Sequence, residues 1–452
     1  MKPITFTVSI LMACLVAPAM AQESLRLTMD DAVLMALRIN KGLEVSRREI
    51  AVADARVDEA FANVYPTVDV NGRYTRNIER QVFFFPGSDG ITRPISVGSA
   101  NAFQADISVN QIIFNNAVFT GVGASEIYAQ ISRQQLRLQA NDVALNVRRA
   151  FLAALLAREA LDVNRALLSN AEENYRTTQA LYKGGLRSEF DAIRAEVQVA
   201  NLRPVIVQGE DAYRNALDNV RMAVGIAPDQ ALELTGSLEA PAEGIPDPQV
   251  VEARAVLEQS NPAIATLRLS NRVDREMIEI NRSDYFPTIS AFGTYQYQAQ
   301  ADNFSELSFQ PTAFVGLNFS FNLFNGGRTH AQVQQARVKV EQGDLQLKQT
   351  SETFATQVEG IIRSIRFARQ RIVATEKTIG QAEKGYRIAV ASYKAGTGTQ
   401  LQINDADLAM AQSRLNRLSA VYDYHVAMAQ LEGLLGTRVS MTDDGNGVRY
   451  NQ

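Results

Sequence analysis

The chain repeats itself, and this duplication limits the folds that it can adopt. The segment VYPTVDVNGRY at 64–74 matches YFPTISAFGTY at 285–295, and LYKGG at 181–185 matches SYKAG at 392–396. The offset between copies falls from 221 to 210 residues between Tyr74 and Phe114, so the first copy has a longer insertion there. Self-similarity over nearly the whole length indicates one architecture built twice rather than two or three unrelated domains.

The repeat sets the expected division of the chain. We expect a first structural repeat at 22–225, a linker rich in proline and glycine at 226–248, a second repeat at 249–436 and a C-terminal tail at 437–452. Each repeat is predicted to run helix, strand, strand, long helix, turn, helix.

The longest predicted helices dominate each copy. Residues 117–183 contain no proline and are predicted to form one helix of 67 residues, and 328–394 give a second of the same length. Each would be ~100 Å long at 1.5 Å per residue, whereas globular helices average about 11 or 12 residues. The first helix carries two apolar stripes displaced by two positions. A helix with two stripes needs a neighbour on each side, as in the wall of a tube.

Shorter helices are predicted beside the long ones. Thr28 is a candidate N-cap of the first helix, because an acidic residue follows three positions later. Pro204 is expected to kink the helix that contains it. We expect the shorter helices to stack end to end alongside the long helices, and they span 31–63, 189–224, 251–283 and 400–435.

Four segments then alternate apolar and polar residues with period 2, which is typical of half-buried strands. A soluble sandwich could use such strands, but their length also suits a β-barrel with lipid outside and a lumen inside. Four strands cannot close a barrel, so a membrane protein would have to oligomerise; eight or twelve strands, from a dimer or a trimer, satisfy the arithmetic. The segments are 67–75, 102–110, 289–297 and 315–322.

The N-terminus predicts export. Residues 1–21 contain Lys2, an apolar run and small residues before a cleavage position between Ala21 and Gln22, the pattern of a signal peptide. Cys14, the only cysteine, is an alternative site of lipid attachment. Cleavage after Ala21 would leave a mature protein without thiols or disulfides.

Composition and motifs argue against several function classes. The net charge of -4 and the lack of a basic block do not favour nucleic acid. His330 and His425 are the only histidines, and neither has a cysteine or paired carboxylates at ligand spacing. We therefore expect no metal site, no cofactor and no enzymatic activity.

The duplicated strand openings at Pro66 and Pro287, the FNNA and FNGG segments and the paired Tyr-Lys-x-Gly turns together resemble the TolC family of outer-membrane factors. The resemblance implies an α+β membrane channel, in which three copies complete a 12-stranded outer-membrane β-barrel continued by a long α-helical coiled-coil tunnel in the periplasm. Loops 77–101 and 299–312 would be extracellular, and the segment 226–248 would join the tail in a belt around the tunnel.

The resemblance also implies a function. The protein would be a passive duct of a tripartite efflux or type I secretion system, localised to the outer membrane with a long periplasmic extension. Its partners would be its own copies in a homotrimer, a periplasmic adaptor (membrane fusion) protein, an inner-membrane pump of RND or ABC type and outer-membrane lipid. The alternative is a periplasmic or surface coiled-coil scaffold without a channel, which has no use for four alternating strands of membrane-spanning length.

In the family, the two helix-to-helix turns form the periplasmic entrance. This resemblance places gate residues at Asp191, Tyr393, Gln402 and Asp405. Gln402 and Gly398 stand where the family has an acid and a base, so salt-bridge closure is in doubt and a ring of Asp405 carboxylates is the strongest remaining expectation. Alternatively, Asp191 and Asp405 are acids favoured near the helix N-terminus by its dipole. The adaptor would contact Tyr182, Lys183, Gly185, Arg187, Ser188, Lys394, Gly396 and Thr399.

Overall fold

The computed structural model describes residues 24–88, 90–242, 247–441 and 447–451. The predicted cleavage residues Ala21 and Gln22, and Cys14, lie outside these ranges. Within the described residues, no helix is both long enough and apolar enough to cross a membrane.

The chain divides into two compact units. The first, here called the turn unit, comprises Met1–Arg38, Val147–Ala240 and Thr375–Tyr422. The second, here called the sheet unit, comprises Ile39–Asn146, Pro241–Ala374 and Asp423–Gln452. Each is described by itself below.

The two helices that follow the strands in each repeat confirm the sequence prediction. Helices α3 (Asn116–Lys183) and α7 (Arg328–Lys394) have 68 and 67 residues. The helices after the turns, α4 (Glu189–Val224) and α8 (Gln400–Leu435), have 36 residues each. Helix α4 continues through Pro204, so the kink stays a prediction, as does end-to-end stacking of the shorter helices.

The predicted single helices at 31–63 and 251–283 are wrong, because each is two helices. The first copy has α1 (Met29–Ile39) and α2 (Lys41–Ala62), and the second has α5 (Val250–Ser260) and α6 (Pro262–Arg282).

An asparagine side chain accounts for each break. Asn40 has extended backbone, and its side chain accepts hydrogen bonds from the amides of Gly42 and Leu43 at 3.0 and 3.3 Å. Asn261 accepts one from the amide of Ile264 at 2.9 Å. An N-cap of this kind starts a new helix by satisfying amides that have no partner in the first turn.

The predicted cap of the first helix is confirmed. The amide of Asp31 donates to Thr28 Oγ1 at 3.2 Å, and the amide of Thr28 donates to Asp31 Oδ2 at 3.2 Å. This reciprocal pair is the capping box that the sequence spacing indicates.

The four alternating segments form one antiparallel sheet in the order β2-β5-β7-β8. Strand β5 pairs with β7, so the central pair of the sheet joins the two repeats. The outer strands β2 and β8 each have one strand partner among the described residues. The bounds confirm the four strands but lengthen β5 and β7, and β8 begins five residues earlier and ends two residues earlier than predicted. They are β2 Thr67–Arg76, β5 Asn101–Phe114, β7 Thr288–Ala301 and β8 Gln310–Ser320.

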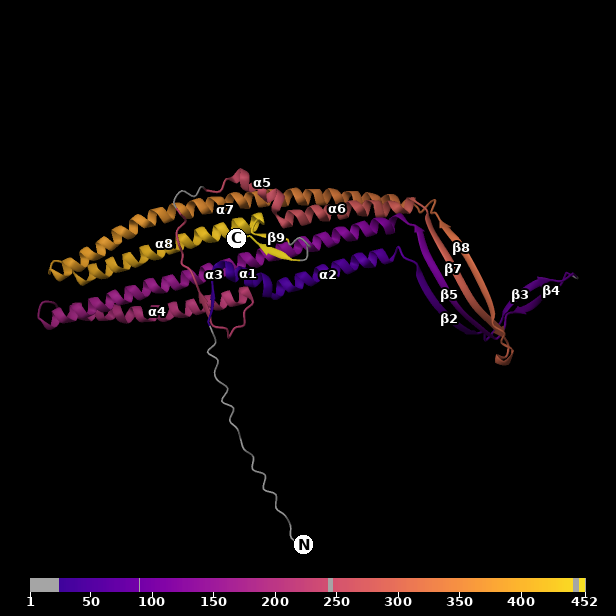
Figure 1. Cartoon of the computed structure of the whole chain (residues 1–452), viewed down its shortest axis with the longest axis horizontal. Coiled ribbons are helices and arrows are strands. Elements are labelled where there is room, and N and C mark those ends of the chain that lie inside the picture. Colours follow the sequence, from indigo (N-terminus) through magenta and orange to yellow (C-terminus); the bar gives the residue numbers. More distant parts are fainter. Residues whose placement is uncertain (1–23, 89, 243–246, 442–446, 452) are drawn as a thin grey trace, which may run out of the picture. The chain divides into compact units, whose positions relative to one another are not determined.

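The connecting segments contain more structure than the sequence indicated. The predicted loop 77–101 forms an antiparallel hairpin of β3 (Gln81–Pro86) and β4 (Thr92–Val97), which Figure 1 shows beyond the end of the sheet. Segment 226–248 contains β6 (Leu232–Leu234), which pairs in parallel with β1 (Leu25–Leu27).

The remaining short elements lie in the second loop and the tail. The predicted loop 299–312 is shortened by β7 and β8 and holds the 3-10 helix η2 (Phe304–Glu306), while another, η1 (Ser283–Tyr285), precedes β7. The tail pairs β9 (Val439–Met441) with β10 (Val448–Tyr450).

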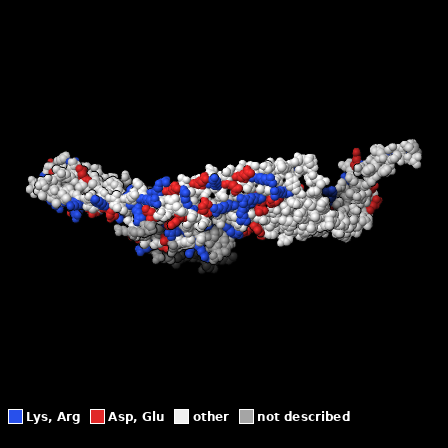
Figure 2. All heavy atoms as spheres, turned by 90° about the horizontal axis from the view of Figure 1, so that it is seen from above, with Lys and Arg blue, Asp and Glu red and all other residues white. Residues whose placement is uncertain are grey.

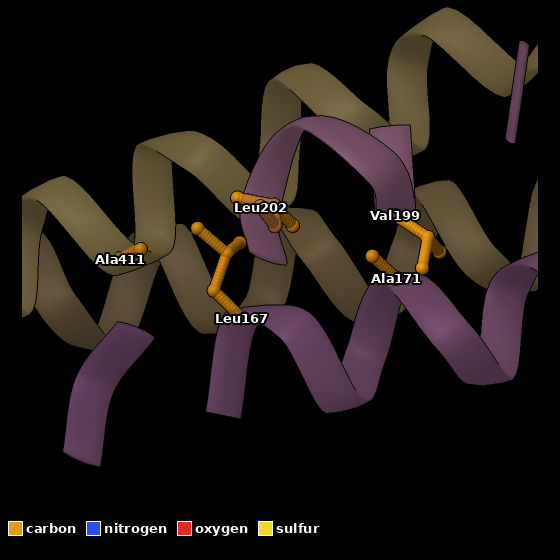
Figure 3. Close-up of a cluster of buried hydrophobic side chains, with 5 residues drawn as sticks. All are labelled: Leu167, Ala171, Val199, Leu202 and Ala411. Atoms are coloured by element: carbon orange, nitrogen blue, oxygen red, sulfur yellow. The ribbon is translucent and has the colours of Figure 1, made fainter. Parts of the chain in front are cut away.

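Small apolar clusters hold the helices together within each unit. In the turn unit, α3, α4 and α8 contribute one cluster, shown in Figure 3: Leu167, Ala171, Val199, Leu202 and Ala411. In the sheet unit, Ile127 and Ile131 of α3 pack with Val273 of α6.

Ion pairs also connect the helices. In the sheet unit Arg268 pairs with Glu258 at 2.7 Å, and Arg254 of α5 pairs with Glu359 of α7. On the face shown in Figure 2, basic and acidic side chains are interspersed accordingly. This face therefore has no large patch of one sign.

Candidate functional site at the helix turns

The candidate site is the pair of turns at 184–188 and 395–399, both in the turn unit. In the first, Gly185 has φ +71. Its amide donates to the carbonyl of Tyr182 at 2.9 Å, and the amide of Leu186 donates to that of Leu181 at 2.9 Å. These two bonds form a Schellman cap, which needs a left-handed residue and therefore favours glycine.

The second turn repeats this geometry. Gly396 has φ +85, its amide donates to the carbonyl of Tyr393 at 3.1 Å, and the amide of Thr397 donates to that of Ser392 at 3.0 Å. The duplicated Tyr-Lys-x-Gly signature is therefore a duplicated helix C-cap, in which the glycine is required by backbone conformation.

Each turn ends at a helix N-cap whose side chain contacts a predicted gate residue, and in the second turn the contact is a capping box. Ser188 Oγ accepts from the amide of Asp191 at 3.2 Å and donates to its carboxylate at 3.0 Å. In the second turn, the amide of Gln402 donates to Thr399 Oγ1 at 3.4 Å, and Gln402 Oε1 accepts from the amide of Thr399 at 3.0 Å. Asp191 and Gln402 thus hold helix N-termini, as the helix-end alternative for Asp191 expects.

Arg187 connects the two turns. Its guanidinium donates a hydrogen bond to the carbonyl of Tyr393, and its Cζ lies 4.1 Å from the centroid of the Tyr393 ring. The tyrosine is only 1% exposed and Arg187 is half-buried, so both the cation–π contact and the hydrogen bond are partly shielded from water. The Tyr393 hydroxyl is buried without a hydrogen-bond partner in the described part of the chain.

Gly398 occupies the position in the second turn that Arg187 has in the first. A Cβ added at Gly398 would lie 2.9 Å from the backbone nitrogen of Tyr393, closer than real Cβ atoms come to other atoms. The amide of Gly398 also donates to the carbonyl of Ser392 at 3.0 Å. Close backbone approach therefore excludes a side chain here, and this explains why the two turns differ.

The other predicted residues are available at the surface. Asp405 is exposed on α8, one turn after the capping box. The structure thus brings Arg187 and Tyr393 together but does not join Asp191, Gln402 and Asp405 to each other. The remaining predicted adaptor-contact residues are all exposed, namely Tyr182, Lys183, Gly185, Ser188, Lys394, Gly396 and Thr399.

A buried carboxylate near the turns was missed from the sequence. Asp407 of α8 is 6% exposed and accepts a hydrogen bond from Asn170 Nδ2 of α3 at 2.9 Å. Burial raises the pKa of Asp407 to about 6, although the hydrogen bond from Asn170 and the charge of Arg414 oppose that rise. Burial, with the charges of Asp407 and Glu173, raises the pKa of Tyr386 to about 12.

Asp407 belongs to a row of buried polar and apolar side chains between α3 and α8, here called the seam. Nearer the turns, Thr178 Oγ1 donates to Gln400 Oε1 at 3.3 Å, and both side chains are fully buried. Ile403 is buried between Gln400 and Asp407. The spacing of three and four residues places these α8 positions on one face. That spacing could have identified Asp407 as a charged member of a buried stripe.

Comparison with known proteins identifies similar chains. Residues 33–226 and 255–437 match the family model of the outer membrane efflux protein. The chain is 26% identical over 341 residues to the alkaline protease secretion protein AprF of Pseudomonas aeruginosa, covering 74% of this chain and 70% of that protein. It is 23% identical over 424 residues to outer membrane protein TolC of Escherichia coli, covering 88% and 80%.

Solved structures show the same fold. VceC of Vibrio cholerae, an outer membrane protein, superposes with a TM-score of 0.72 at 17% identity, covering 90% of this chain and 96% of that one. The open state of the MtrE outer membrane channel of Neisseria gonorrhoeae gives 0.73 at 15% identity, covering 90% and 88%. The predicted fold class is therefore confirmed.

Proposed function

Since this chain belongs to the outer membrane efflux protein family, we propose that it is the outer-membrane channel of a tripartite efflux or type I secretion system. It is a passive duct that conducts substrates from a periplasmic adaptor and an inner-membrane pump to the cell exterior. The names of its relatives cover both system types, since one is a protease secretion protein and another, CzcC of Cupriavidus metallidurans, is a cobalt-zinc-cadmium resistance protein.

The observation that carries this proposal is an open four-stranded sheet with exposed apolar side chains. Val70 is 75% exposed on β2, and Val315 and Leu317 are 88% and 74% exposed on β8. Such surface is stable against lipid but not against water. The periplasmic scaffold alternative leaves these side chains without a function.

The free edges of this sheet favour a homotrimer. In lipid, backbone groups at a sheet edge must find partners. Pairing β2 of one copy with β8 of the next repeats one contact around a ring, which closes when the rotation allows it. Three copies give twelve strands and leave an aqueous lumen, whereas two copies give eight strands and an interior filled by side chains.

The helix turns are proposed as the periplasmic entrance and the adaptor-contact surface. Exposure of both turns supports contact with an adaptor protein. Because Asp191 and Gln402 bind their own helix N-termini, the exposed Asp405 carboxylates are the principal charged ring of the proposed gate. Tyr393 is proposed to act through Arg187, as the buried anchor that holds the first turn against the second.

Conductance in planar bilayers tests the proposal. The purified mature protein should form trimers that conduct ions, and Asp405→Ala should raise single-channel conductance, alone or with Asp191→Ala. Glu189→Ala is a matched control, because Glu189 is an exposed carboxylate at the start of α4. Recovery of the mature protein from the aqueous periplasmic fraction without detergent would rule out a membrane channel. Unchanged conductance in the Asp405 variant would remove it from the gate.

A further inference from the structure

The β3–β4 hairpin carries large apolar side chains on both of its faces, and Arg93, opposite Phe85 near the tip, is its one charged side chain within the two strands. Its register pairs Phe83 with Ile95 and Phe84 with Pro94, on opposite faces of the hairpin. Phe83 and Ile95 are 42% and 50% exposed, and Phe84 is 69% exposed. On the face shown in Figure 2, this projecting element carries no visible charged side chain.

The root of the hairpin is held in place by polar contacts. Asn77 binds the other end of the hairpin, donating from its backbone to the carbonyl of Ala100 and from its side chain to that of Ser99, both at 2.8 Å. Arg80 pairs with Asp302, in the loop after β7, at 2.6 Å, and the same carboxylate accepts from the amide of Ala100 at 3.0 Å. These contacts attach the hairpin at a defined position in the fold.

The exposed apolar side chains of the hairpin are not buried by other described residues of its own chain. An isolated two-stranded hairpin is marginally stable in water, and contiguous exposed apolar surface marks an interaction site. Because both faces are apolar, one neighbour can cover only half of the exposed surface. The hairpin therefore fits an arrangement that gives it two neighbours.

Lipid is the less favoured cover. Tyr74, near the end of β2, and Tyr297 of β7 suit the aromatic belt at a membrane surface. The charged residues Arg76, Glu79 and Arg80 then separate the apolar strand from the hairpin. Charged side chains are stable in the headgroup region or in water, which places the hairpin beyond the hydrocarbon layer.

We propose that the hairpins of three copies pack around the threefold axis, with one face of each hairpin against the opposite face of the next. They would form an apolar ring that narrows the outer mouth of the channel. This inference rests on the proposed function, since the ring requires a trimer. It follows from continuity with the proposed junction between copies, because the hairpin extends directly from β2, whose free edge meets the next copy. A cyclic trimer gives each hairpin two neighbours, which matches its two apolar faces.

Disulfide cross-linking tests this arrangement. In a Cys14→Ser background, the pair Phe84→Cys and Ile95→Cys puts thiols on opposite faces, which cannot bridge within one hairpin. Mild oxidation should then yield covalent trimers on denaturing gels, whereas either single variant should yield none. Val82→Cys with Val97→Cys repeats the test at a second level of the hairpin, should the first pair prevent assembly.

Trimer formation and conductance are measured on the same preparations, which separates the two proposals. Conducting trimers without cross-links overturn the ring alone, whereas absence of trimers overturns the proposed function. Cross-links in the single variants, or quenching of a fluorophore at position 84 by lipid-borne quenchers, would also overturn the ring. If the ring narrows the mouth, Phe84→Glu should raise conductance relative to Gln81→Glu, which adds charge where the side chain is already polar.

Discussion

Replacing Asp407 by asparagine is expected to stabilise the protein at neutral pH and to weaken the pH dependence of its stability. The carboxylate lies in the seam between α3 and α8, where Asn170 donates to it. Arg414 supplies an opposing charge, but this arginine also pairs with Glu383 of α7 at 2.7 Å. Tyr386 faces the site from α7, with its pKa raised to about 12, so it is neutral below pH 10.

The sign and size of the expected change in stability follow from the raised pKa of Asp407. Burial raises the pKa of Asp407 from 3.8 to about 6, so between these values the folded state binds the proton more tightly than the unfolded state. Stability should therefore fall as pH rises through this window and stay reduced above it. About two pKa units at 1.36 kcal/mol each give at most about 3 kcal/mol per chain. At about 2.1 cal/mol/K per residue, this corresponds to ~3 °C in melting temperature.

The assay compares apparent melting temperatures of detergent-solubilised wild type and Asp407→Asn at about pH 4.5 and about pH 7.5. The variant should be the more stable protein at the higher pH, and the difference in melting temperature should narrow to about a third at the lower pH. Asp405→Asn, on the exposed side of the same helix, should show no such difference. If the two proteins differed in melting temperature by the same amount at both pH values, or by more at the lower pH, the lower stability of the wild type could not be assigned to the buried charge of Asp407.

Three further predictions concern the turns and the helix caps. Arg187→Ala should raise channel conductance because it removes the contact with Tyr393, and Arg187→Lys should give an intermediate value; equal conductance in all three proteins would exclude the contact from closure. Gly398→Ala should destabilise the second turn by about 1–3 kcal/mol, seen as faster proteolysis there, and unchanged proteolysis would contradict the close-approach argument. Asn261→Ala should lower stability by about 1–2 kcal/mol, because it removes the cap of α6 and the hydrogen bond from Asn261 to the carbonyl of Leu434 at 2.7 Å; an unchanged melting temperature would contradict this.

Much of the fold could be predicted because its signals are local. The absence of proline and an apolar repeat near 3.6 predicted α3 and α7, and alternation with period 2 predicted the four strands of the sheet. The breaks at Asn40 and Asn261 were missed, although Asn261 precedes Pro262, a proline suited to the first helical position. There the apolar pattern continued across the break and concealed the cap.

The positions of the two turns could be predicted from the sequence, but the contacts between them could not. Sequence spacing could not tell that Arg187 binds Tyr393, because this contact joins residues 206 positions apart. It likewise gave no account of why Gly398 must be glycine, which depends on the backbone of Tyr393 lying 2.9 Å from the place of a Cβ.

The sequence by itself determined the duplication, the long helices, the alternating strands and the position of the two turns. These follow from backbone preferences and from which side of each element is apolar, and both are properties of neighbouring residues. Only the tertiary structure decided that Asp407 is buried and that β3 and β4 form a doubly apolar hairpin. It also decided that Arg187 links the two turns. The reason is physical, since burial and pairing depend on which distant segment packs against a residue, and periodicity along one segment does not carry that information.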